Sequence, residues 1–255
     1  MTRIILVASG KGGVGKTTIA TNLAITLSRL GQDLVLIDAN TSTGNMAWHL
    51  GLSKPTTTLQ HVLDDQTVID DAIYYHSEGL KFIPSLTTVQ GLLTKPKRDI
   101  KQAVLELVGR TDIILIDGAA GLGKELQDIL PIADEVLIVT NPDVPSVMEA
   151  FKTKELSNSL GIKSSGLIIN KASTKKFDMH PINVSDFVET DLLGVVPEHD
   201  LFKQAVLEQT PILSLDRNAH PSRELYKIAA KLLGQEYNYP PQQSFLEKVM
   251  GFFKK

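Results

Sequence analysis

Short apolar runs alternate along this chain with longer segments that have helical periodicity. Most of the short runs are continuously apolar, as in strands that are buried on both faces of a parallel sheet. The predicted strands are Arg3–Ala8, Asp33–Asp38, Leu80–Pro84, Asp112–Asp117, Glu135–Thr140, Gly166–Asn170 and Gly194–Val196.

The predicted helices lie between them, at Lys16–Leu30, Ile100–Gly109, Leu122–Leu130, Ser146–Leu160, Leu201–Gln209 and Ser222–Leu233. This alternation predicts an α/β fold: a doubly wound, mostly parallel sheet of about seven or eight strands flanked by helices. Such sheets bind their ligands beyond the carboxyl ends of the strands.

Composition narrows the class of protein. The chain has 255 residues, 42% hydrophobic and 22% charged, which is ordinary for a folded domain with a core. A net charge of −3 gives no global attraction to nucleic acid. The absence of cysteine excludes disulfides and thiolate-bound metal clusters and is compatible with the cytoplasm. No apolar run reaches the roughly 18 residues of a membrane span, and the N-terminus does not read as a signal peptide.

A glycine-rich loop, Gly10–Thr17, follows the first predicted strand and matches G-x-x-x-x-G-K-T. Its glycines allow backbone N–H groups to surround phosphate oxygens, helped by the positive end of the next helix. Lys16 would neutralise the β- and γ-phosphates, and the Thr17 hydroxyl would ligate Mg²⁺. The loop predicts a P-loop site for a nucleoside triphosphate with Mg²⁺.

Asp38 and Asp117 each end a predicted strand. Either carboxylate alone could simply cap its strand. Because the carboxyl ends of parallel strands share one edge of the sheet, we expect both to meet the P-loop there. With Thr17 they are the predicted metal ligands.

The loop K-G-G-V-G-K-T, with its additional lysine at Lys11, resembles the deviant Walker A loop of the MinD/ParA family of P-loop ATPases. Four further stretches resemble the MinD branch of that family. They are D-G-A-A-G (Asp117–Gly121), T-N-P-D-V-P-S-V (Thr140–Val147), L-I-I-N-K (Leu167–Lys171) and G-V-V-P-E (Gly194–Glu198).

The resemblance implies roles for individual residues. Lys11 would reach the ATP of a partner subunit, and Asn170 and the backbone around Pro197 would hold adenine. Glu149 could pair with Lys11 or be an exposed helix residue. The implied catalytic residues are Lys11, Lys16, Asp38 and Asn40. The implied nucleotide-binding residues are Gly10, Lys11, Gly12, Gly13, Val14, Gly15, Lys16, Thr17, Thr18, Asn170 and Pro197.

One position departs from the family. Where its members usually read D-x-D in the first switch, this chain reads Asp38-Ala39-Asn40. A carboxamide cannot accept a proton, but phosphoryl transfer mainly requires that the attacking water be positioned. We therefore expect slow ATP hydrolysis.

The last residues form a separate predicted unit. We divide the chain into an ATPase domain (1–234), a Pro-containing linker (235–243) and an amphipathic helix (244–255). On a helical projection the lysines of this last segment lie opposite an apolar face, as in helices that bind anionic membrane surfaces. The alternative is a helix that docks on the domain's own core. The predicted membrane-facing residues are Phe245, Leu246, Val249, Met250, Phe252 and Phe253.

Together these features predict a cytoplasmic ATPase switch, peripheral on the cytoplasmic face of the cell membrane. It would bind Mg-ATP, form a homodimer when ATP-bound, and position division or other cell-surface machinery with an unidentified protein partner. Two alternatives stay open: a ParA-like ATPase acting on DNA, and a scaffold that binds ATP without hydrolysing it. Nucleic acid is disfavoured by the acidic net charge, and the basic clusters Lys95–Arg98 and Lys171–Lys176 read as solvated loops.

Overall fold

The computed structural model describes residues 1–40, 44–85, 96–173 and 176–236. It confirms the predicted α/β fold, with one eight-stranded sheet in the order β3-β4-β2-β5-β1-β6-β7-β8. All neighbouring strands pair in parallel except the edge pair β3–β4. The strands are β1 (Arg3–Ser9), β2 (Leu34–Asp38), β3 (Tyr74–Tyr75), β4 (Lys81–Ile83), β5 (Ile113–Ala120), β6 (Glu135–Thr140), β7 (Lys163–Ala172) and β8 (Leu192–Pro197).

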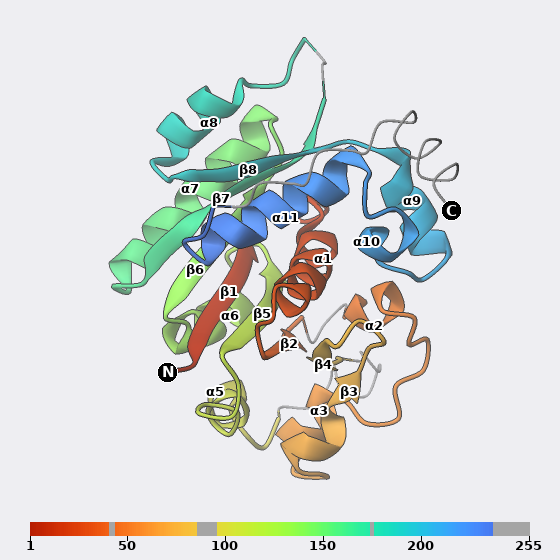
Figure 1. Cartoon of the computed structure of the whole chain (residues 1–255). Helices are drawn as coiled ribbons and strands as arrows, with labels where there is room; N and C mark the ends of the chain where they lie inside the picture. The colour runs from red at the N-terminus through yellow and green to blue at the C-terminus, as the bar shows by residue number, and fades with distance from the viewer. Residues whose placement is uncertain (41–43, 86–95, 174–175, 237–255) are drawn as a thin grey trace, which may run out of the picture.

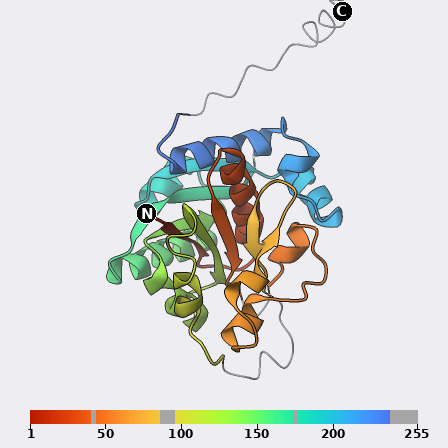
Figure 2. The ribbon, with the colours of Figure 1, turned by 60° about the horizontal axis from the view of Figure 1, so that its bottom comes forward.

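Helices cover both faces of the sheet (Figure 1). One face carries α1 (Lys16–Arg29), α2 (Met46–His49), α9 (Asp200–Leu207), α10 (Ile212–Leu215) and α11 (His220–Leu232). The other carries α3 (Leu59–Leu63), α5 (Ile100–Leu105), α6 (Lys124–Ile129), α7 (Val144–Ser159) and α8 (Pro181–Val188), with 3₁₀ turns η1 (Ile69–Ala72) and η2 (Leu130–Ile132). The turned view in Figure 2 shows α11 lying alongside α1.

The continuous apolar strands explain this double covering. In β1, Ile4, Leu6 and Ala8 belong to one core cluster, whereas Ile5 and Val7 belong to the cluster on the opposite face. All five are buried. Because successive side chains of a strand point to opposite faces, a run without polar residues must be buried on both.

Several described elements were not predicted, namely β3, α2, α3, α8, α10 and the two 3₁₀ turns. The antiparallel strand β3 has only two residues, too few to give a periodic pattern. Helix α8 begins with Pro181, and the His180 side chain accepts a hydrogen bond from the Ile182 N–H as its N-cap. Helix α5 ends at Leu105, earlier than the predicted Gly109.

The parallel pairing determines where the functional residues lie. Asp38 is in register with Asp117 on the neighbouring strand, and Asp117 is in register with Val7 on β1. Both carboxylates therefore lie at the sheet edge from which the P-loop leaves β1. Residues 237–255, with most of the predicted linker and the whole predicted membrane helix, lie outside the described part of the chain. Among the described helices, none has the length and apolar character to cross a bilayer.

Candidate nucleotide site

The P-loop connects β1 to α1 by a tight path that two glycines permit. Gly15 caps α1 in the left-handed region, with φ of 89°. At Gly10 a Cβ atom would lie 2.3 Å from the carbonyl oxygen of Glu149 on α7. A side chain at either position would distort the loop, so local geometry explains both glycines.

The first residue of α1 makes a buried ion pair. Lys16 Nζ lies 2.5 Å from Asp117 Oδ1, and the two side chains are 6% and 0% exposed. Removing either partner would leave a buried charge unpaired, which is costly. The loop lysine is thus held at the carboxyl edge of β5.

Asp38 lies beside this pair and is also buried. Its two carboxylate oxygens accept hydrogen bonds from the backbone N–H groups of Asn40 (3.1 Å) and Met46 (3.3 Å). Burial, reinforced by the negative charge of Asp117, raises the pKa of Asp38 to about 8. Two carboxylates therefore share one lysine, and the cluster holds excess negative charge when both are ionised.

This cluster fits a divalent cation. Among the residues that the structure describes, the buried second oxygen of Asp117, Oδ2, has no hydrogen-bond partner, and a buried polar atom without a partner is unfavourable. Mg²⁺ prefers one or two carboxylates together with water and phosphate oxygens. Asp117, Asp38 and the half-buried Thr17 in the first turn of α1 would hold it.

Lys11 points to a different environment from Lys16. Its Nζ lies 3.2 Å from Asp143 Oδ1 and 3.2 Å from Ser146 Oγ at the start of α7, and its side chain is 44% exposed. Glu149 is not its partner, because the Glu149 carboxylate pairs with Lys152 at 2.7 Å. Asp143 is the N-cap of α7, and its carboxylate accepts a hydrogen bond from the Ser146 N–H. Capping therefore fixes the carboxylate that pairs with Lys11.

The adenine-side residues lie at the ends of β7 and β8. A cavity of about 770 Å³ there is lined by Ala172, Ser173, Pro197, Glu198 and His199 among others. Asn170 does not line it; its Nδ2 donates to the Val14 carbonyl of the P-loop at 2.7 Å. The implied role of Asn170 at adenine stays a prediction.

Comparisons with known proteins agree with this geometry. Residues 2–153 match the AAA domain family. The chain is 32% identical to an uncharacterized ATP-binding protein of Methanocaldococcus jannaschii, over 98% of this chain and 96% of the relative. It is 31% identical to a putative septum site-determining protein MinD of Emiliania huxleyi, over 94% and 90%. The MinD structure from Pyrococcus horikoshii, complexed with Mg-ADP, superposes with a TM-score of 0.87 and 27% identity over 97% and 99%.

The chain belongs to the MinD/ParA family of P-loop ATPases. Its fold and P-loop are those of an ATP-binding ATPase, as the sequence predicted.

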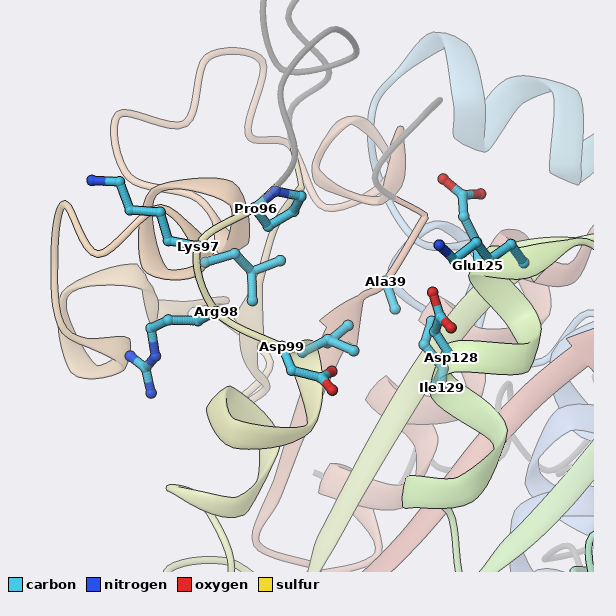
Figure 3. Close-up of a pocket in the computed structure, with 11 residues that line it drawn as sticks. Ala39, Pro96, Lys97, Arg98, Asp99, Glu125, Asp128 and Ile129 are labelled. Carbon is cyan, nitrogen blue, oxygen red and sulfur yellow. The ribbon is translucent and has the colours of Figure 1, made fainter.

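A second cavity of this ATPase, about 440 Å³, lies beside the first switch (Figure 3). Ala39, which follows Asp38, lines it, and Glu125 and Asp128 of α6 extend toward it. Lys97 and Arg98 point away, and Arg98 pairs with Asp65 and Glu106 instead. Of this basic cluster, Arg98 is therefore engaged in ion pairs within the protein.

Several residues at the site were missed by sequence reasoning. Asn141, Asp143, Ser146 and Lys171 all contact the P-loop or its additional lysine. All four lie in stretches quoted for the resemblance to MinD, so the sequence marked the segments but not the individual side chains. Which side chain faces the loop depends on how α7 begins and how β7 ends, and the sequence pattern does not specify that.

Proposed function

We propose that this protein is an Mg-ATP-dependent switch that dimerises in its ATP state and then attaches to anionic membrane through residues 244–255. Bound in that way, it would position cell-division or other cell-surface machinery, in line with its similarity to a putative septum site-determining protein. Hydrolysis would return it to a monomer that leaves the membrane.

The observation that carries the proposal is the different placement of the two loop lysines. Lys16 is buried and serves its own loop, whereas Lys11 is half-exposed and held at the loop's outer side by Asp143. A lysine held outward can reach a nucleotide on a facing subunit, where its charge would stabilise the γ-phosphate. In a dimer Lys11 would therefore contact the γ-phosphate of the facing subunit, a role that it does not have in the monomer.

The residues of the monomer would divide the remaining work. Lys16 would neutralise phosphate charge, while Asp117, Asp38 and Thr17 would hold the cation. Bound Mg²⁺ would neutralise charge on the β- and γ-phosphates. Asn40 would position the attacking water without accepting its proton, so that turnover is slow in the absence of an activating partner.

The membrane step follows from avidity. A helix of about twelve residues binds weakly and reversibly on its own. Two such helices in one dimer can raise the overall affinity by about 10²–10⁴ through effective concentration. Nucleotide state would thus control membrane attachment without any change in the helix itself.

Sedimentation with anionic liposomes tests the proposal. We would compare the full chain, a chain ending at Pro241 and full-length Phe252→Ser, each with Mg-ATP and Mg-ADP. The full chain should pellet with ATP and stay largely in solution with ADP, and the other two should stay in solution in both. Equal pelleting of the full and shortened chains in both nucleotides would refute the membrane switch.

A further inference from the structure

We propose that Asn141, Asn170 and Lys171 form a clamp that fixes the P-loop carbonyl groups of Gly13 and Val14, so that the loop is shaped to bind a triphosphate whatever its base. The inference rests on the proposed nucleotide site. It makes these three side chains positioning residues, and it gives Asn170 a task other than holding adenine.

Consecutive residues of β7 bind consecutive carbonyls of the loop. Asn170 Nδ2 donates to the Val14 oxygen at 2.7 Å, and Lys171 Nζ donates to the Gly13 oxygen at 2.6 Å. Asn170 is buried, with 4% of its surface exposed. The buried amide therefore holds a defined position against the loop.

Asn141, just after β6, supplies the third contact. One end of its side-chain amide lies 3.1 Å from the Val14 oxygen and 3.1 Å from the Asn170 backbone oxygen. Both neighbours are acceptors, so the amide nitrogen must occupy that end. The Val14 carbonyl thus receives two amide donors, one from β7 and one from the residue that follows β6.

Close packing and an unusual backbone indicate that the clamp is tightly held. A Cβ atom on Gly15 would lie 2.3 Å from Asn170 Nδ2, so the loop runs directly against this amide. Lys171 adopts a left-handed backbone with φ of 54°, which a non-glycine residue rarely adopts. Such strain persists only where the surroundings enforce it.

The geometry of the peptide bond links the clamp to phosphate binding. In a planar trans peptide the C=O of one residue and the N–H of the next point in opposite directions. When the carbonyls of Gly13 and Val14 are fixed toward β6 and β7, the N–H groups of Val14 and Gly15 point away from the clamp. Those N–H groups are then available to phosphate oxygens. The clamp contacts no base, so its effect does not depend on the base.

Isothermal titration calorimetry of the full chain with ATP and with inorganic tripolyphosphate tests this inference, since tripolyphosphate has no base. Asn170→Ala and Lys171→Met should each weaken both ligands by a similar factor of roughly five to ten, as for loss of one hydrogen bond. Lys171→Arg should restore most of the affinity. Asn158→Ala and Lys231→Met, the same types of change on the distant helices α7 and α11, should leave both affinities unchanged.

A merely structural role would lower the melting temperature but not the affinity of the folded protein for tripolyphosphate. If Asn170→Ala weakens ATP and leaves tripolyphosphate unaffected, Asn170 recognises the base and the clamp is refuted. Wild-type protein that binds neither ligand would instead refute the proposed function, and the clamp with it.

Discussion

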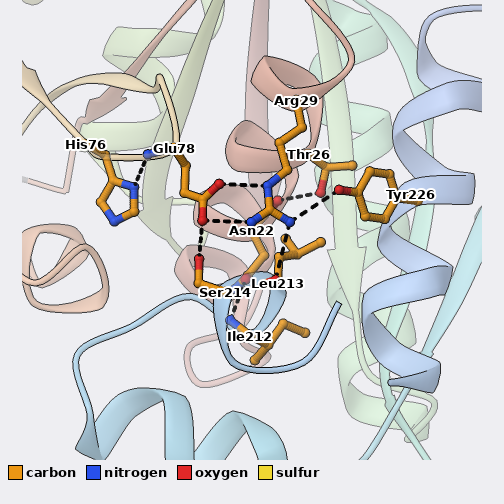
Figure 4. A network of polar contacts seen from close by, with 9 residues as sticks. All are labelled: Asn22, Thr26, Arg29, His76, Glu78, Ile212, Leu213, Ser214 and Tyr226. Carbon is orange, nitrogen blue, oxygen red and sulfur yellow. Dashed lines mark hydrogen bonds and ion pairs between the residues drawn. The ribbon is translucent and has the colours of Figure 1, made fainter. Parts of the chain in front are cut away.

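The first and last residues of helix α1 both have a positively charged side chain, but the surroundings of these two side chains differ. At the first residue, Lys16 pairs with Asp117, which lies beside buried Asp38 and whose second oxygen has no partner within the described part of the chain. At the last residue, Arg29 contacts both carboxylate oxygens of Glu78 and donates to the Leu213 carbonyl and the Tyr226 hydroxyl (Figure 4). At the first residue two carboxylates surround a single lysine, whereas at the last residue Arg29 and Glu78 neutralise each other within the fold.

This difference assigns ligand binding to the first end of α1 and stabilisation of the fold to its last end. At the carboxyl end of the sheet, a cation and phosphates could satisfy charges that the protein alone does not satisfy. At the amino end, Glu78 also accepts from Ser214, so the network ties α1 to the β3–β4 hairpin and to α10. We infer that changes at the first end alter ligand binding and turnover, whereas changes at the second alter stability.

The largest effect is expected for Asp117→Asn. The variant keeps the shape of the side chain but removes the carboxylate that would hold Mg²⁺, so ATP turnover should fall by about 10²–10³-fold. A phosphate-release assay at saturating Mg-ATP measures it. Asp112→Asn, one residue before the same strand, is the matched control and should retain turnover; equal losses in the two variants would contradict the assignment.

The pH dependence of stability tests whether Asp38 and Asp117 hold excess negative charge beside Lys16. Because the folded state raises the pKa of Asp38 to about 8, that state binds the proton more tightly than the unfolded chain. The contribution of Asp38 to stability should therefore fall as pH rises from about 4 to 8. Relative to Asp38→Asn, the wild type should lose about 3–4 kcal/mol between pH 5 and pH 8.

Urea unfolding of both proteins in EDTA measures this change. Only the pH dependence of the difference matters, because the amide also alters one hydrogen bond to the backbone. A difference in the free energy of unfolding that stays constant from pH 5 to pH 8 would mean that folding does not raise the pKa of Asp38.

At the other end of α1, Arg29→Met should lower the free energy of unfolding by about 2 kcal/mol, since it removes charged hydrogen bonds that are partly buried. ATP turnover per folded molecule should be unchanged. Arg110→Met, which removes an exposed ion pair to Asp70, should change the free energy of unfolding much less than Arg29→Met does. A loss of turnover in folded Arg29→Met would show that the two ends are coupled rather than separate.

Asn40→Asp tests the first switch and should have the smallest effect. Its carboxylate could accept a proton from the attacking water, so phosphate release should rise about tenfold. The Asn40 N–H already donates to Asp38, which places the residue at the site. No increase would show that this position does not orient the water.

Sequence and structure agree best where one strong local pattern decides the outcome. Continuous apolar runs predicted the buried strands, and the position of Asp38 and Asp117 at the carboxyl ends of two strands predicted that they would lie at one site. The partner of Lys11 could not be predicted in this way, because the side chains of Asp143 and Ser146 point to Lys11 while that of Glu149 pairs with Lys152. The Lys171 contact was missed for a similar reason, since its direction depends on a left-handed backbone at the end of β7.

Sedimentation velocity of the full chain tests the central claim most directly: that ATP drives dimerisation through Lys11. Wild type and the exposed-lysine control Lys101→Ala should be dimers with Mg-ATP and monomers with Mg-ADP. Lys11→Ala should bind ATP and remain a monomer. A wild type that stays monomeric when saturated with ATP, or a Lys11→Ala variant that dimerises as well as the wild type, would contradict the account.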